Sequence, residues 1–445
     1  MTGVFERLRD HPAAPTWNHR VHDRLTVEDL AAIDRLRLRL PQRRGIRAAA
    51  PSPATLTRVA RWRETVPLFR RTLPRGPLGD GWDALPTMSR EELASAPAEL
   101  IPDDADLTSM VCYRTSGTTG HVLLVPYHPL AAAANCVFIE EALRRHGVAL
   151  DVGERAVACF LVGAQARTVT YPAVLQAWRG AGFAKLNLRA GEWPSDDAAA
   201  RYFEDLAPQL LTGDPISLAE LLRLGLPTRP RAILTTAVAM STGLARRLGA
   251  AFGCPVIDWY SLTETGPIGY ACALGGGFHL LPDDLHLEAL GPDGRPVPDG
   301  ERGEVTVSGG RNPFIPLCRY RTGDFGRIDR APCPCGDPMP LIRELEGRPP
   351  VDFRASDGGA VNPVDISRVL RELPLVQHEL CQRADGSLDL VARPITDAEV
   401  STELLAATLA SLFGAQPIRV RLDDTLGDRT PGGKAVPYRS ELYEE

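Results

Sequence analysis

The chain has 445 residues, of which 44% are hydrophobic and 24% charged, and its formal net charge is -6. This composition excludes an intrinsically disordered chain, and it lacks the basic excess of a nucleic-acid-binding protein, so no nucleic-acid partner is expected. The length predicts more than one folding unit. Of the 50 basic residues only Lys185 and Lys434 are lysines, and we interpret the arginine excess as compositional bias.

Nothing in the sequence predicts insertion into a membrane or secretion. The chain contains no apolar run of about 18 residues, which a membrane helix requires. Charged residues stand close to Met1, where a signal peptide would be apolar. We therefore expect a cytoplasmic protein with no membrane partner. In a reducing compartment its nine cysteines do not predict a disulfide framework.

Taken in chain order, residues 1–105 are predicted to be mostly helical, and the spacing of Ser89 and Glu92 predicts a capping box at a helix start. From 110 to 270, short apolar runs alternate with alanine-rich helical stretches. This alternation predicts α/β layering around a largely parallel sheet. Turn sequences between 278 and 330 separate short alternating segments, which favour a smaller antiparallel sheet.

The last hundred residues are predicted to form a compact α+β module with two helices and at least two strands. We therefore predict an α/β protein with two domains. Residues 1–344 form a large N-terminal α/β domain with a mostly helical first part and a small β subdomain. Residues 345–445 form the small C-terminal domain, and the boundary rests on the change of pattern alone.

A run of hydroxyl and glycine residues follows a short apolar segment that starts at Val111. Glycine allows backbone N–H groups to turn toward a polyanion, and hydroxyls add further donors. A Walker A loop is excluded because no Gly-Lys-Ser/Thr follows. Taken alone, the run is equally consistent with a polar surface loop. As a phosphate-binding loop it comprises Thr115, Ser116, Gly117, Thr118, Thr119 and Gly120.

A second polar motif follows the strand-like run that leads to Asp258. Within it, Tyr260 can stack on a base, Thr263 can bind phosphate, and Glu264 can hold Mg²⁺ through its oxygens. On its own the motif is as readily a loop that contains a single acid. The motif becomes informative because it follows the phosphate-loop motif along the chain.

A third motif, Tyr320–Asp324, ends a strand, and the Asp324 carboxylate can accept two hydrogen bonds from a ribose diol; alone it would be a capped turn. The three motifs in this order resemble the adenylate-forming superfamily of acyl-CoA synthetases, most closely the phenylacetate-CoA ligase group. The resemblance covers roughly residues 85–445. It also makes Arg429–Lys434 similar to the family's closing loop, whose lysine contacts the carboxylate and the α-phosphate during adenylation.

The resemblance implies ATP-dependent activation of a carboxylic acid to an acyl adenylate, with release of pyrophosphate and then transfer to CoA. It implies that the C-terminal domain is a mobile lid, and that a homodimer is one expected assembly. Catalytic roles fall on Thr263, Glu264 and Lys434, with Mg²⁺ held by Glu264. Nucleotide-binding roles fall on the phosphate loop 115–120 and on Asp258, Tyr260, Asp324 and Arg348.

Three positions depart from the family pattern. His121 stands where the phosphate loop usually continues with lysine, Pro350 replaces an acidic hinge residue, and Asp357 replaces a common arginine in the following loop. Prolines restrict the backbone rotation of a hinge. Adenylation is therefore better supported than thioester formation, and an amine or hydroxyl acceptor is an alternative to CoA. A catalytically silent nucleotide-binding protein is a further alternative.

Three cysteines lie in Gly/Pro-rich loops rather than among apolar neighbours. Cys272 and His279, with Cys333 and Cys335, supply three thiolates and one imidazole, a normal ligand set for a closed structural Zn²⁺ site. The spacing is not that of a standard zinc finger. The alternative is a set of reduced cysteines beside a surface histidine.

The acid-binding pocket is the least defined part of the prediction. Small and apolar residues at the expected positions suit a flat ring, so an aromatic acid of the benzoate or arylacetate kind, with or without an amino or hydroxy substituent, is expected. Taken alone, each of them is better explained as an ordinary core residue than as part of a pocket wall. The candidates are Gly163, Ala164, Gln165, Ala237 and Ser261.

Overall fold

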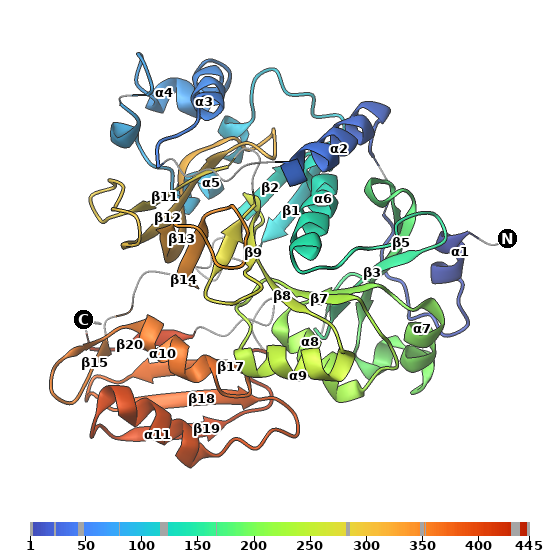
Figure 1. Ribbon diagram of the computed structural model, residues 1–445, viewed down its shortest axis with the longest axis vertical. Coiled ribbons are helices and arrows are strands. Elements are labelled where there is room, and N and C mark those ends of the chain that lie inside the picture. The colour runs from blue at the N-terminus through green and yellow to red at the C-terminus, as the bar shows by residue number, and fades with distance from the viewer. Residues whose placement is uncertain are drawn as a thin grey trace. The chain divides into compact units, whose positions relative to one another are not determined.

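The computed structural model (Figure 1) describes residues 3–21, 24–42, 49–79, 81–115, 123–165, 167–281, 285–347, 351, 353–428 and 437–442. The chain forms two compact units that interleave along the sequence. Unit 1 comprises Met1–His22, Ala149–Asp258 and Pro350–Glu445. Unit 2 comprises Asp23–Val148 and Trp259–Pro349.

The main sheet of unit 1 is parallel apart from one edge strand, which confirms the α/β prediction. Its strands are β3 (Val157–Gly163), β4 (Tyr171–Leu175), β5 (Ala181–Asn187), β6 (Leu210–Gly213), β7 (Ala232–Thr235) and the first residues of β8 (Val256–Leu262). Their order is β8-β7-β6-β3-β5-β4, and β4 runs antiparallel to β5. The chain passes from β3 to β5 and then returns to β6 on the other side of β3, so the strand order reverses there.

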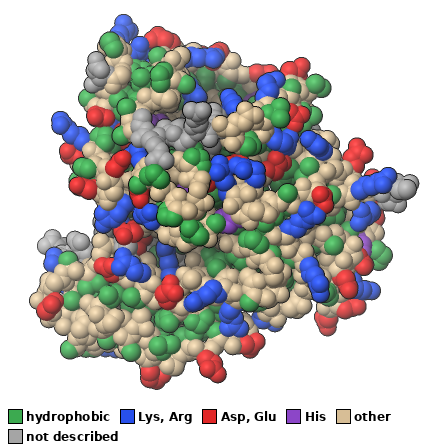
Figure 2. All heavy atoms as spheres, viewed as in Figure 1, with side chains coloured by type: hydrophobic (Ala, Val, Ile, Leu, Met, Phe, Trp, Pro, Cys, Tyr) green, Lys and Arg blue, Asp and Glu red, His purple; other side chains and the backbone are tan. Residues whose placement is uncertain are grey.

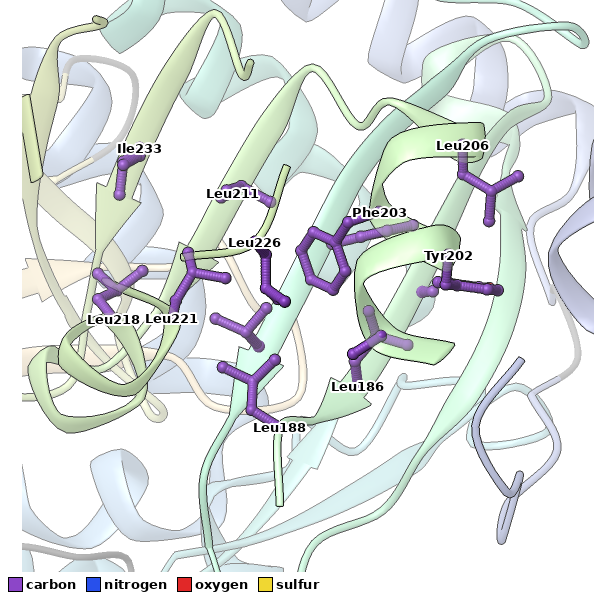
Figure 3. Close-up of a cluster of buried hydrophobic side chains, with 14 of the residues drawn as sticks. Leu186, Leu188, Tyr202, Phe203, Leu206, Leu211, Leu218, Leu221, Leu226 and Ile233 are labelled. Carbon is purple, nitrogen blue, oxygen red and sulfur yellow. The ribbon is translucent and has the colours of Figure 1, made fainter. Parts of the chain in front are cut away.

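Amphipathic helices bury their apolar faces on this sheet. They are α1 (Val4–Arg9), α7 (Ala198–Leu206), α8 (Pro215–Leu224) and α9 (Thr242–Phe252). In Figure 3, aromatic and leucine side chains of α7 and α8 lie among strand residues such as Leu211 and Ile233. Burial of one such side chain contributes roughly 1.5–3 kcal/mol, and this core fixes the strand ends that carry the candidate acid pocket.

The local sequence explains where these helices begin and end. Asp214 caps α8, because its side chain accepts hydrogen bonds from the backbone N–H groups of Ile216 and Ser217. Pro215 occupies the first helical position, where its missing N–H costs nothing. Gly225 ends the helix at φ +58°, a conformation that favours glycine.

The C-terminal segment forms an α+β module, as predicted. Its elements are β15 (Phe353–Arg354), β16 (Ala360–Val361), α10 (Pro363–Arg371), β17 (Leu375–Gln382), β18 (Leu388–Pro394), α11 (Thr402–Phe413), β19 (Ile418–Leu422) and β20 (Tyr438–Ser440). The larger sheet has the order β19-β18-β17-β20. Leucines of β17 and β18 share a core with α11. Within unit 1, Ser241 at the start of α9 donates a hydrogen bond to the carbonyl of Leu375 at 2.5 Å.

The first four helices of unit 2 confirm the helical character predicted for residues 1–105. They are α2 (Val27–Arg39), α3 (Pro53–Thr65), α4 (Pro67–Thr72), α5 (Arg90–Ser95) and α6 (Pro129–Arg145). The capping box predicted before α5 is present, since Ser89 and Glu92 each accept the other's backbone N–H. Short 3-10 helices cover Leu40–Gln42, Trp82–Ala84, Pro97–Leu100, Gln176–Trp178 and Ala190–Glu192. None of the described helices combines the length and apolar character needed to cross a membrane.

The strands of unit 2 confirm the predicted antiparallel sheet. They are β9 (Gly266–Ala271), β10 (Phe278–Leu280), β11 (His286–Leu290), β12 (Arg302–Gly309), β13 (Leu317–Asp329), β14 (Leu341–Gly347) and the last residues of β8. Their order is β11-β12-β13-β14-β10-β9-β8. A separate hairpin pairs β1 (Val111–Thr115) with β2 (Leu123–Tyr127).

Candidate active site

Glu264 lies in the turn between β8 and β9 and is only 2% exposed. Its Oε1 accepts a hydrogen bond from the Tyr320 hydroxyl at 2.6 Å and another from Arg90 Nη1 at 2.9 Å. Its Oε2 accepts no hydrogen bond from any residue within the described ranges. A buried carboxylate is stable only with such partners. Burial, reinforced by Glu264, raises the pKa of Tyr320, which therefore stays a proton donor.

A second hydrogen bond joins the two predicted nucleotide motifs. The Tyr260 hydroxyl donates to Asp324 Oδ2 at 2.8 Å. Burial and the neighbouring Asp324 raise the pKa of Tyr260 well above its usual value, so this hydroxyl also stays protonated. The Tyr260 ring packs in the core beside Phe278, with 8% of the residue exposed. The residues predicted to hold adenine and ribose are thus directly linked.

The turn that carries Asp324 is held by a residue that the sequence did not single out. Glu304 of β12 accepts the backbone N–H of Gly323 at 3.1 Å and Nε of Arg321 at 2.6 Å. Gly323 adopts φ +78°, which favours glycine. The Asp324 backbone N–H donates to the Thr322 hydroxyl. These bonds set the orientation of the Asp324 carboxylate.

Arg90 is the second residue that the sequence did not single out. The backbone of Met88 pairs with β13 on both sides, because it donates to the Arg319 carbonyl and accepts from the Arg321 N–H. The buried guanidinium of Arg319 donates to the carbonyls of Asp83 and Leu85. These bonds fix the segment that ends at Arg90. The only signal in the sequence was the capping box, which places the start of α5.

Thr115, Thr263 and Asp258 are described, whereas several other predicted site residues lie outside the described ranges. Thr115 is the last residue of β1, and its backbone pairs with Leu123 of β2. Thr263 is described and exposed, in the turn before Glu264, and Asp258 is half-buried at the end of the segment that pairs with β7. The predicted positions outside the described residues are Ser116, Gly117, Thr118, Thr119, Gly120, His121, Arg348, Pro350 and Lys434.

Candidate residues for the acid pocket lie at the carboxyl ends of the parallel strands of unit 1. Gly163 ends β3, and the next N–H, of Ala164, donates to the Ser217 hydroxyl at 3.0 Å. The carbonyl of Gln165 accepts a hydrogen bond from Asn187. Ligands of open α/β sheets bind at carboxyl ends where the strand order reverses, and here that point lies between β3 and β6.

Ala237, after β7, is the strained member of this group. It is exposed and has φ +75°, a left-handed conformation that costs a non-glycine residue roughly 1 kcal/mol. Such strain accumulates at ligand-binding sites. Ser261 is half-buried in the part of β8 that belongs to unit 2, so the structure does not group it with the other four candidates.

The predicted metal ligands converge. Ligand atoms of Cys272, His279, Cys333 and Cys335 all lie within 4.8 Å of one another. The sulfurs of Cys272 and Cys333 are 3.7 Å apart, and His279 Nε2 is 3.1 Å from the Cys335 sulfur. His279 Nδ1 lies 3.0 Å from the carbonyl of Met339, which fixes the tautomer with Nε2 available as a ligand. Three thiols and one imidazole fit a tetrahedral Zn²⁺ ion.

An outer layer of hydrogen bonds supports this cluster. The backbone N–H of Asp337 donates to the Cys335 sulfur at 3.4 Å, and the Tyr270 hydroxyl donates to the Asp337 carboxylate. Arg145, at the end of α6, lies 3.6 Å from the same carboxylate and also pairs with Glu141. The cluster is thereby connected to a helix as well as to strands β9 and β10.

Fold and site together define an adenylate-forming enzyme. The chain belongs to the AMP-binding enzyme family, whose model matches residues 71–312. Over 116 residues it is 30% identical to the phenylacetate-coenzyme A ligase of Thermus thermophilus, a stretch that covers 25% of this chain and 26% of that ligase. The chain thus matches about a quarter of the length of that curated relative.

Two solved structures share the fold. A 2-hydroxyisobutyryl-CoA ligase in the postadenylation state matches with a TM-score of 0.67 and 16% identity, over 90% of this chain and 92% of that one. An anthranilate CoA ligase in complex with anthranoyl-AMP matches with a TM-score of 0.52 and 14% identity, over 75% and 68%. The predicted fold, with a large N-terminal and a smaller C-terminal domain, is confirmed.

Proposed function

We propose that the protein activates a small aromatic carboxylic acid with ATP and transfers the acyl group to CoA. The observation that carries this proposal is the pair of hydrogen bonds that joins the two nucleotide motifs, Tyr260 to Asp324 and Tyr320 to Glu264. Side chains suited to a ribose and to a metal-bound polyphosphate are held by partners from each other's motif. These two hydrogen bonds would not be expected if the second motif were merely a surface loop that contains a single acidic residue.

In the first half-reaction a carboxylate oxygen attacks the α-phosphorus of ATP. The bond from that phosphorus to the oxygen bridging to the β-phosphate breaks, and pyrophosphate leaves with the electron pair. This chemistry depends on positioning and on charge neutralisation. Mg²⁺, when bound, offsets the polyphosphate charge. Glu264 fits as its ligand because it is a buried carboxylate whose Oε2 has no hydrogen-bond donor among the described residues.

In the second half-reaction the CoA sulfur attacks the acyl carbon, and AMP leaves with the oxygen that linked it. Lys434 is assigned to the first half-reaction, where its ammonium would stabilise charge on the α-phosphate. Replacing Lys434 with alanine should abolish pyrophosphate release and leave ATP affinity nearly unchanged. A silent nucleotide-binding protein would instead bind ATP and release no pyrophosphate with any acid, even in the native chain.

An aromatic substrate is supported by the small residues Gly163, Ala164 and Ala237 at the strand ends of unit 1. The names of two relatives, a phenylacetate and an anthranilate ligase, point the same way. The test is a pyrophosphate-release assay over substituted benzoates, arylacetates and fatty acids. Turnover of a fatty acid in preference to every aromatic acid would reject the aromatic assignment and keep the adenylation chemistry.

One residue, Asp357, favours an acceptor of the acyl group other than CoA. Its side chain is exposed and accepts the backbone N–H of Gly359 at 2.8 Å, in the loop where relatives present arginine. A carboxylate there would repel the phosphates of CoA, so transfer to an amine or hydroxyl is the alternative. Product analysis with the cognate acid separates the two, because efficient thioester formation with free CoA excludes the alternative.

We also propose that Cys272, His279, Cys333 and Cys335 hold a structural Zn²⁺ ion. Four protein ligands leave no open position for substrate, so the ion would stabilise the loops after β9 and β13 rather than take part in the reaction. Metal analysis of the purified protein tests this assignment. One equivalent of zinc per chain is expected.

A further inference from the structure

The ion pair between Arg90 and Glu264 joins a partly exposed cation to a buried carboxylate, as the pair of Arg144 and Glu141 does in the same unit. The Glu264 side chain is 2% exposed and the Arg90 side chain 27%. The guanidinium therefore reaches a buried carboxylate from a partly open position. Surface pairs of this unit differ, since Arg61 and Asp104 are 2.8 Å apart with 71% and 51% of their side chains exposed. Charged side chains of both signs are interspersed on the face drawn in Figure 2.

The chain fixes the backbone of Arg90 next to this carboxylate. Arg90 is the first residue of α5, directly after the Ser89 cap, and Met88 is hydrogen-bonded to β13 on both sides. The same strand supplies Tyr320, which bonds the same oxygen of Glu264. Helix α5 also packs on β2, the strand that follows the phosphate loop in sequence. These bonds hold the backbone of this segment, and none of them involves the Arg90 guanidinium.

Charge balance requires a cation on the phosphate side of Glu264. ATP carries four negative charges and Mg²⁺ offsets two. His121 stands where the family resemblance implies a lysine at the end of the phosphate loop. Arg311, another cation close to this turn, donates through both terminal nitrogens to the carbonyls of Pro267 and Leu281 and lies 4.1 Å from the Phe138 ring centre. Arg311 is therefore committed to holding the fold, whereas Arg90 is held by the carboxylate that Mg²⁺ would contact.

We propose that Arg90 is a polyphosphate-binding residue that takes the role of the missing loop lysine. In the ligand-free protein it neutralises Glu264. With Mg²⁺ on the Glu264 carboxylate, repulsion between the two cations turns the guanidinium toward the β- and γ-phosphates, whose oxygens match its planar donor geometry. This inference rests on the proposed function, because it requires ATP to bind beside Glu264.

Equilibrium binding of Mg·ATP and of AMP tests the proposal, measured by calorimetry on the native chain and on three variants. AMP lacks the β- and γ-phosphates, so it reports on the nucleoside site alone. For Arg90→Gln we expect Mg·ATP to bind at least about tenfold more weakly and AMP to bind within about twofold of the native value. Arg90→Lys should restore most of the Mg·ATP affinity, and Arg61→Gln, the matched surface control, should change neither.

Three results would overturn the proposal. Unchanged Mg·ATP affinity in Arg90→Gln would show that the guanidinium does not reach the phosphates. Equal weakening of Mg·ATP and AMP, together with a lower melting temperature, would assign Arg90 to the support of the turn. Tighter Mg·ATP binding would make Arg90 only a competitor of Mg²⁺. A native chain that binds neither nucleotide would instead reject the proposed function, which keeps the two failures distinct.

Discussion

Unit 2 contains two polar clusters that differ in how the charge of their side chains is balanced. Around Glu264 a buried carboxylate is matched by the cation of Arg90 and by the donor hydroxyl of Tyr320. In the cluster of Cys272, His279, Cys333 and Cys335 the four potential ligand atoms lie within 4.8 Å of one another. In the first cluster, the charge of the Glu264 carboxylate is balanced by a protein side chain. In the second cluster, four potential metal ligands face one another, and a bound cation would balance the charge of their thiolates.

This difference predicts how each cluster responds to change. Thiolates brought within 4.8 Å of one another repel unless a metal ion lies between them, so the second cluster should depend on its ion for stability. The first cluster is self-sufficient when empty and becomes a site only when a polyanion arrives. Changes there should affect ligand binding and catalysis more than folding.

The largest effect is expected from breaking the cysteine–histidine cluster. Replacing Cys335 with serine removes one of four ligands, so the zinc content should fall from about one equivalent to near zero. The melting temperature should fall by more than about 5 °C, because the free energy of zinc binding is lost from the folded state. Cys112, which is exposed, gives the matched control as Cys112→Ser. A native chain that is purified without metal, and whose melting temperature is not lowered by Cys335→Ser, would contradict the zinc assignment.

The next effect concerns the carboxylate of the other cluster. Glu264→Gln keeps the shape and the capacity to accept from Tyr320, but it removes the charge that would hold Mg²⁺. We expect pyrophosphate release to fall by about 10²- to 10³-fold, a loss typical of one electrostatic group at a reacting centre. AMP affinity and melting temperature should change little. If Glu264→Gln released pyrophosphate at the wild-type rate at low Mg²⁺, Glu264 would have no role in the reaction.

A smaller effect tests the link between the motifs. Tyr260→Phe removes the hydroxyl that donates to Asp324 at 2.8 Å. A hydrogen bond to a charged group contributes about 1.5 to 3 kcal/mol, so the KM for ATP should rise by about ten- to 150-fold while the zinc content stays constant. Phe278→Leu, which alters the ring packing beside Tyr260 and keeps its hydroxyl, is the control. Equal effects of both variants would assign Tyr260 to packing alone.

The same contrast explains what could be predicted from the sequence. Cys272 directly follows β9, His279 lies in the neighbouring strand β10, and Cys333 and Cys335 share one short loop. The residue types and their Gly/Pro-rich loops indicated this set, although the spacing is not that of a standard zinc finger. The α/β layering and the Ser89 cap were also predicted, because apolar periodicity and caps are local signals. Local patterns did not predict that unit 1 would be built from three separate segments of the chain.

The partners of the nucleotide carboxylates were not predictable in this way. Arg90 is 174 residues from Glu264, and Glu304 belongs to a strand whose sequence carries no catalytic motif. Arginine is so frequent in this chain that no single one stands out. The pairing of Met88 with β13 helps to bring Arg90 to Glu264, and such long-range pairing leaves no periodic trace in the sequence. Counter-charges are therefore found from tertiary structure, whereas self-contained ligand sets are found from sequence.

The smallest expected effect lies in a third buried group of unit 2, at His286. This side chain packs edge-on against Trp82, and its Nε2 makes no hydrogen bond with the described residues. Burial, with Arg330 and Arg319 nearby, lowers the pKa of His286 to about 4. The unfolded chain takes up a proton near pH 6.5 and the folded chain near pH 4, so stability is complete above pH 6.5 and is lost as the pH falls toward 4. At pH 5.5 the loss should be on the order of 1 kcal/mol.

The measurement is the melting temperature of the native chain and of His286→Gln between pH 8 and pH 5.5. Glutamine cannot take up a proton in this range, so the difference between the two melting temperatures should narrow by a few degrees as the pH falls. The zinc ligands titrate equally in both proteins, and the difference between them therefore isolates His286. A constant difference across the range would mean that the folded chain accommodates the protonated imidazole, for which Glu288 Oε2 at 4.0 Å is the nearest counter-charge.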